Sequence, residues 1–151
     1  MRFLVGSDHA GTTMRGVVAA HLVARGHTVD EIGPEPGERA DYPDPAAVVA
    51  RAVVADGEAG KGTRGVLVCG TGIGVSIAAN KVHGVRAALV HDLVTARLAA
   101  QHNAANVLCL GGRLLAPEYA CMCVDAWLDA AFEERHQVRI DKIGRIEKSG
   151  G

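Results

Sequence analysis

Short apolar runs alternate along this chain with longer stretches that mix apolar and polar residues. Five runs of four to six residues predict strands: 2–6, 27–32, 65–69, 85–90 and 107–110. Strands that are apolar at nearly every position are typical of a parallel sheet with both faces covered.

The stretches between these runs follow the period of a helix. Met14, Val18 and Leu22 recur at the spacing of one helical face, and Gly26 ends that helix. Further helices are predicted over 45–56, from the glycines of 70–74 to about 80, over 92–102 and from 117 onward. One face of the last helix carries Val124, Trp127, Leu128 and Ala131. Residues 33–44, rich in Pro, Gly and acids, predict a loop.

This alternation predicts an α/β fold. We expect a three-layer α/β/α sandwich around a Rossmann-like, five-stranded parallel sheet. The length of 151 residues fits a single domain over 1–151, with a charged tail from about residue 133. Ligands of such sheets bind beyond the carboxyl ends of the strands, so residues that follow strands are the first candidates for chemistry.

Composition narrows the functional class. The formal net charge of −1 argues against a nucleic-acid partner, which would require a basic face. No apolar run is long enough to span a membrane, and the first apolar stretch is too short for a signal peptide. The spacing of the four cysteines suggests no disulfide framework. We therefore expect a cytoplasmic protein without a membrane partner.

Two strands end in residues that can do chemistry. Asp8 and His9 follow the first strand, where Asp8 could either contact a ligand or cap the next helix. Cys69 ends the third strand, before the glycine-rich turn 70–74. Backbone N–H groups in such a turn favour bound anions and the thiolate form of a neighbouring cysteine. The alternative interpretation of Cys69 is a buried strand cysteine.

The same turn also permits an interpretation as a dinucleotide-binding fingerprint. Gly70 and Gly72 fit that pattern, and Asp92 lies at about the distance of the ribose-binding acid. However, Val75 occupies the place of the third small residue, and the turn belongs to the third βα unit instead of the first. The match is weak.

Several basic residues lie in the second half of the chain. His102 ends the helix predicted over 92–102, where it could simply stabilise the helix terminus. Arg113, Arg135 and Arg139 carry planar charged groups suited to phosphate, or else belong to a solvated tail.

Taken together, these segments resemble the ribose-5-phosphate isomerase B and galactose-6-phosphate isomerase family. The longest match is Cys-Gly-Thr-Gly-Ile-Gly-Val-Ser-Ile-Ala-Ala-Asn-Lys at 69–81. The others are Ser-Asp-His-Ala-Gly at 7–11, Asp-Tyr-Pro at 41–43, Gln-His-Asn at 101–103, Gly-Gly-Arg at 111–113 and Arg-His-Gln-Val-Arg at 135–139. They follow the family order over nearly the whole chain.

The resemblance implies an aldose–ketose isomerase that acts through a cis-enediolate, without metal or cofactor. Cys69 would move the proton from C2 to C1, and His102 would assist opening of the sugar ring. Asp8 would order the sugar hydroxyls, while Thr71 with the N–H groups of the turn would stabilise the enediolate. The sugar would also be bound by His9, Tyr42, Gly70, Gly72, Ile73, Gly74 and Asn103. The phosphate would be held by His9, Arg113, Arg135 and Arg139.

The resemblance fixes the reaction better than the sugar. Ribose 5-phosphate is the leading substrate, and galactose 6-phosphate, allose 6-phosphate or a tetrose phosphate remain alternatives. A nucleotide-binding module is a remote one. One branch of the family uses a glutamate within the turn in place of the cysteine. This chain has Val75 there and keeps Cys69.

Topology suggests that the site is shared between two subunits. The helix over 92–102 starts at the edge of the sheet that carries Asp8 and Cys69, and it runs antiparallel to the strands. Its ten residues place His102 roughly 15 Å away, toward the opposite edge. Either the family role of His102 does not apply to this chain, or the His102 that serves Cys69 comes from a second chain. We favour the second and expect a homodimer with composite active sites, which could further assemble into a tetramer.

Overall fold

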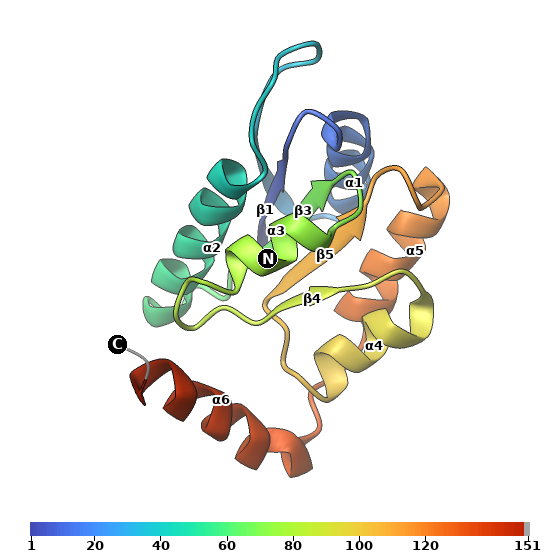
Figure 1. Cartoon of the computed structure of the whole chain (residues 1–151). Coiled ribbons are helices and arrows are strands. Elements are labelled where there is room, and N and C mark those ends of the chain that lie inside the picture. The colour runs from blue at the N-terminus through green and yellow to red at the C-terminus, as the bar shows by residue number, and fades with distance from the viewer. Residues whose placement is uncertain (150–151) are drawn as a thin grey trace.

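The computed structural model describes residues 1–149, and these form one parallel sheet flanked by helices (Figure 1). The strands are β1 (Arg2–Ser7), β2 (Thr28–Ile32), β3 (Arg64–Cys69), β4 (Ala87–Leu89) and β5 (Val107–Gly111). They lie in the order β2-β1-β3-β5-β4, and every neighbouring pair is parallel. The predicted fold class is confirmed.

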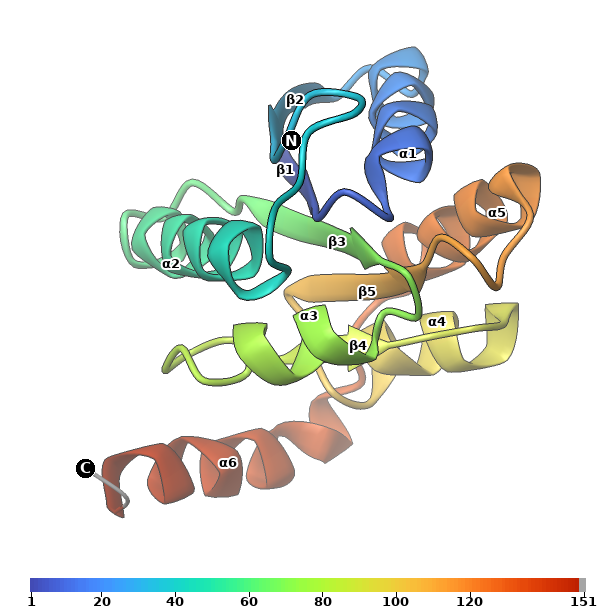
Figure 2. The ribbon, with the colours of Figure 1, turned by 45° about the horizontal axis from the view of Figure 1, so that its top comes forward.

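Helices cover both faces of this sheet (Figure 2). They are α1 (Thr12–Ala24), α2 (Pro43–Glu58), α3 (Ile73–Ala79), α4 (Leu93–Gln101) and α5 (Pro117–Leu128). A 3₁₀ turn (Glu134–His136) and α6 (Gln137–Ser149) follow them in the chain and lie outside the two layers (Figure 2). Alternate strand residues feed two cores, as the pleat requires. Val66 and Val68 pack toward α1, α4 and α5, whereas Leu67 and Cys69 pack toward α2 and α3.

The chain changes direction across the sheet between β1 and β3. β2 lies on the outer side of β1, while β5 and β4 follow on the far side of β3. Such a switch point opens a crevice at the carboxyl ends of the two strands. It is therefore the ends of β1 and β3, at Ser7 and Cys69, that position a candidate site.

Three details differ from the sequence prediction. The fourth strand contains only Ala87–Leu89. At its start the Asn106 side chain accepts the N–H of Arg86, and the Asn106 N–H donates to the Arg86 carbonyl oxygen, so Arg86 belongs to a loop contact. The apolar face predicted for the last helix included Ala131, but α5 ends at Leu128, so Ala131 lies outside the helix. The charged tail folds largely into α6, which has no buried residue along its described length. No helix within residues 1–149 is long and apolar enough to cross a membrane.

Candidate active site

The thiol of Cys69 lies where the last residue of β3 meets the glycine turn. The N–H of Gly72 donates a hydrogen bond to Cys69 Sγ at 3.1 Å. The sulfur therefore lies against a backbone N–H of the turn that leads into α3. Cys69 is only 4% exposed, so this interaction is shielded from bulk water.

Gly72 is required by the geometry of this turn. Its φ is +79°, in the left-handed region that favours glycine. A Cβ at this position would lie 2.5 Å from Leu89 Cδ1 and 2.9 Å from the carbonyl carbon of Leu110. The chain can therefore turn back from β3 into α3, with its N–H directed at the thiol, only because this residue has no side chain.

Asp8 lies beside the thiol, at the end of β1. Its Oδ1 accepts the N–H groups of Ala10 at 2.9 Å and Gly11 at 3.1 Å, so the cap-like interpretation holds for that oxygen. The carboxylate is 7% exposed and still lines the pocket in front of Cys69. The two hydrogen bonds therefore fix the orientation of the Asp8 side chain, which also lines the pocket.

His9 and Tyr42 come from the loops that border the pocket. His9 Nδ1 donates to the carbonyl oxygen of Ala40 at 2.9 Å, which leaves Nε2 free for a ligand. The Tyr42 ring lies against Gly74, where an added Cβ would approach ring atoms to 2.9 Å. The glycine thus makes room for the aromatic wall of the pocket.

Arg113 supplies a positive charge from the turn after β5. Its N–H donates to Gly70 O at 3.0 Å, and its guanidinium lies over Gly70. Together these residues surround a pocket of about 230 Å³. The lining residues are Asp8, His9, Ala10, Tyr42, Cys69, Gly70, Thr71, Gly74 and Arg113. A candidate base, oriented N–H groups and a cation therefore meet in one place, as proton abstraction beside an anionic group requires.

The remaining predicted residues form a second group. His102 caps the end of α4, and its ring stacks on that of His136 with centroids 4.2 Å apart. Glu133 lies within ion-pair distance of His102, His136 and Arg135. Arg139 contacts His136 from α6. Asn103 is exposed at the end of this group, and its backbone oxygen accepts from Arg86. We call Glu133, Arg135, His136, Arg139 and His102 the basic cluster.

The pocket and the basic cluster lie at opposite edges of the sheet. Cys69 pairs with Gly111 at one end of β5, and Gly65 pairs with Val107 at the other. Four residues of strand separate these ends by about 13 Å. The segment after His102 returns to the far end, where Asn106 O accepts the N–H of Gly65 at 3.0 Å. Within one chain, His102, Asn103, Arg135 and Arg139 therefore lie away from Cys69.

Glu133 and His136 were not among the predicted site residues. Their link to His102 is spatial, and no spacing in the sequence signals it. His102, Glu133 and His136 bring ligand-type atoms within 4.8 Å of one another, as a metal site would. The charges oppose such a site, because Arg135 and Arg139 lie against the same groups. The cluster is better suited to an anion.

Asp92 has a structural role that conflicts with the dinucleotide interpretation. It caps α4, and its Oδ1 accepts the N–H of Thr95 at 2.8 Å. This hydrogen bond holds the pKa of Asp92 below its ordinary value. Its carboxylate is therefore engaged by the helix and does not point to a ribose.

Known proteins match this chain over almost its whole length. A family model described as Ribose/Galactose Isomerase matches residues 3–143. Ribose-5-phosphate isomerase B of Escherichia coli K12 is 46% identical over 144 residues, which cover 95% of this chain and 94% of that protein. D-erythrulose-4-phosphate isomerase of Pectobacterium atrosepticum is 41% identical over 145 residues, covering 95% and 93%.

A solved structure gives the same result in three dimensions. Ribose-5-phosphate isomerase B from Mycoplasma genitalium, with bound ribulose 5-phosphate, superposes with a TM-score of 0.90. It is 45% identical, and the match covers 97% of this chain and 96% of that one. The resemblance seen in the motifs is thus confirmed over sequence and fold alike, and this chain belongs to the ribose/galactose isomerase family.

Proposed function

We propose that this protein interconverts ribose 5-phosphate and ribulose 5-phosphate, with Cys69 as the general base. The observation that carries the proposal is the hydrogen bond from Gly72 N–H to Cys69 Sγ at 3.1 Å, inside the pocket that Arg113 borders. An aldose–ketose isomerase needs a base beside adjacent carbons and a cation for the remote phosphate, and this pocket offers both.

The chemistry moves one proton between neighbouring carbons. From the open-chain aldose, Cys69 takes the proton of C2, and the electrons of that bond form the enediolate. The developing oxygen charge is stabilised by the Thr71 hydroxyl and the N–H groups of the turn. The proton of the C2 hydroxyl passes to O1, the carbonyl forms at C2, and the thiol returns its proton to C1, which gives the ketose. Asp8 holds the sugar hydroxyls from its fixed position beside the thiol.

Opening of the sugar ring requires the second group of residues. We propose that His102, Asn103, Arg135 and Arg139 of one protomer complete the pocket of a second protomer in a two-fold homodimer. The separation of about 13 Å between the two edges of the sheet supports this arrangement, because a single chain cannot bring His102 to its own Cys69. His9 and Arg113 would then hold the phosphate together with the partner subunit's arginines.

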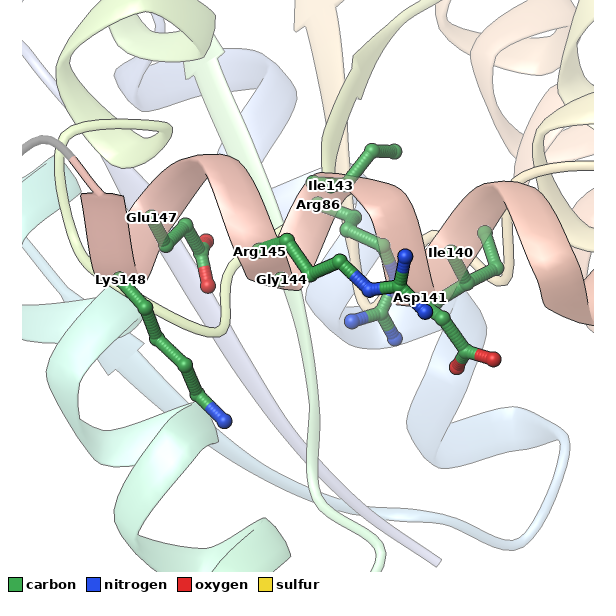
Figure 3. A pocket seen from close by; sticks show the side chains of 8 residues that line it. All are labelled: Arg86, Ile140, Asp141, Ile143, Gly144, Arg145, Glu147 and Lys148. Atoms are coloured by element: carbon green, nitrogen blue, oxygen red, sulfur yellow. The ribbon is translucent and has the colours of Figure 1, made fainter.

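The form of α6 supports the same dimer. Val138 and Ile146 are 58% and 70% exposed on this helix, and Ile77 on α3 is also exposed. A hollow of about 400 Å³ separates α6 from Arg86 (Figure 3). Its walls are Arg86, Ile140, Asp141, Ile143, Gly144, Arg145, Glu147 and Lys148. α6 contacts the rest of its chain through Glu147, which accepts the N–H of Gly84 at 3.0 Å, and it leaves Val138 and Ile146 uncovered. Such residues are suited to a second copy of the chain.

An assay with sugar phosphates of different chain lengths can identify the substrate. D-erythrulose-4-phosphate isomerase among the relatives favours a tetrose phosphate as the second candidate substrate. We propose to measure kcat/KM for ribose, erythrose, allose and galactose phosphates with a chelator present and no nucleotide added. Ribose 5-phosphate should give the highest value. A higher value for another sugar would reassign the substrate, and a requirement for metal or nucleotide would overturn the mechanism.

We also propose a cytoplasmic location. All four cysteines carry free thiols, and three of them are buried. Free thiols persist in a reducing compartment, so fractionation of the cell should recover the protein with the cytosolic enzymes.

A further inference from the structure

Glu133 is the residue that connects the members of the basic cluster. Its Oε2 lies 2.6 Å from the guanidinium of Arg135, 3.6 Å from His136 Nε2 and 3.9 Å from His102 Nε2. Its own N–H donates to Gln101 O at 2.9 Å, beside His102. The carboxylate is therefore fixed by its backbone and by an arginine while it faces both imidazoles.

His136 forms a flat wall behind His102. It is 3% exposed, and the two rings stack with an angle of 29° between their planes. Arg139 can only donate to His136 Nδ1, so the neutral ring carries its proton on Nε2, on the side of Glu133. Among residues 1–149, His136 Nε2 is buried without a hydrogen-bond partner.

Burial, together with the charges of Arg135, His102 and Arg139, lowers the pKa of His136. Glu133 acts in the opposite direction, but the net effect favours the neutral ring beside His102. In contrast, the side chain of His102 is 32% exposed. Glu133 and His136 are thus the groups that fix the orientation of an otherwise accessible ring.

We infer that Glu133 and His136 are positioning residues for ring opening, and that they act by holding the His102 imidazole in one orientation. This inference rests on the proposed function. Ring opening breaks the bond from C1 to the ring oxygen, forms the aldehyde carbonyl and moves the proton of the C1 hydroxyl to the ring oxygen. An imidazole that accepts this proton and delivers it must face both oxygens, so a small rotation interrupts the step.

Two rates separate this role from a general loss of function. Consumption of ribose 5-phosphate requires ring opening. Exchange of the C1 hydrogen of ribulose 5-phosphate in D₂O requires Cys69, the groups that stabilise the enediolate and phosphate binding, but no ring opening, because this ketose is open-chain. NMR can follow both rates for each variant.

The variants are chosen to remove one contact at a time. Glu133→Gln keeps an acceptor for Arg135 but removes the charge. His136→Asn keeps an acceptor for Arg139 but removes the stacked ring, and His136→Phe keeps a flat ring. The control is His83→Asn, the same change at an exposed histidine outside the cluster.

We expect Glu133→Gln and His136→Asn to slow consumption of ribose 5-phosphate by about ten- to a hundredfold. Exchange into ribulose 5-phosphate should stay within about twofold of the wild type, because Cys69 is untouched. His136→Phe should retain more of the isomerisation rate than His136→Asn, and His83→Asn should retain all of it.

Equal losses of both rates would overturn the inference, because the cluster would then serve phosphate binding or the fold. Unchanged rates in both variants would overturn it as well. A wild-type protein that shows neither rate would instead contradict the proposed function, so the two failures are distinguishable.

Discussion

Cys69 is the residue on which the proposed reaction depends most directly. We predict that Cys69→Ala lowers kcat for ribose 5-phosphate by at least about 10²-fold, because general-base catalysis contributes roughly 10²–10⁴-fold. Unlike the variants of the basic cluster, it should also abolish hydrogen exchange into ribulose 5-phosphate. NMR in D₂O measures both rates. Exchange that persists in Cys69→Ala would assign the base to another residue.

At the residue scale, the sequence predicts some of the site and misses the rest for a physical reason. Asp8 and Cys69 were identifiable because parallel strands bring their carboxyl ends to one edge, so position along the chain gives position in space. Glu133 and His136 follow no strand. Their contact with His102 depends on how the segment after α5 folds back to Gln101, which no local pattern encodes.

At the scale of elements, the turn between β3 and α3 depends on Gly72. We predict that Gly72→Ala destabilises the protein by about 2–4 kcal/mol, from left-handed strain and from overpacking against Leu89 and Leu110. Gly16→Ala is the matched control in α1, where an added Cβ meets nothing within 4 Å. It should stabilise by up to about 1 kcal/mol. Urea unfolding measures both, and equal effects would contradict this role of Gly72.

The cap of α4 gives a prediction about pH. The hydrogen bond from Thr95 depresses the pKa of Asp92 in the folded state, so its stabilising contribution is present above the unfolded value of about 4. It declines below that pH and is lost as pH falls through the folded pKa. Urea unfolding from pH 7 to 3 should therefore show the wild type losing its advantage over Asp92→Asn. A pH-independent difference would refute the assignment.

The elements were predictable to different degrees. β1, β3 and β5 are central and buried at all positions after the first residue of β1 and β3, so their apolar patterns predict them well. β4 lies at an edge, and just before Ala87–Leu89 the Asn106 side chain accepts the N–H of Arg86. α6 is charged around much of its surface, and none of its residues is buried within the described chain. The sequence therefore has no apolar stripe from which this helix could be predicted to pack on the fold.

At the scale of the whole molecule, the shared site can be tested by complementation. Chains carrying Cys69→Ala or His102→Ala should each be inactive with ribose 5-phosphate. Unfolding and remixing them should restore one intact site per mixed dimer, about a quarter of all sites if pairing is random. Differently tagged chains and two-step purification isolate the mixed dimers. Mixed dimers without activity would show that the site is not divided in this way.

The residues at the two edges of the sheet are also synthesised at different times. The ribosome finishes the strands that carry Asp8 and Cys69 long before it reaches Arg135 and Arg139, and chains begin to fold as they emerge. Under the proposed assembly, a growing chain holds the thiol without the groups that open a sugar ring. Catalysis then begins only when two finished chains meet, so its onset follows the concentration of completed protein.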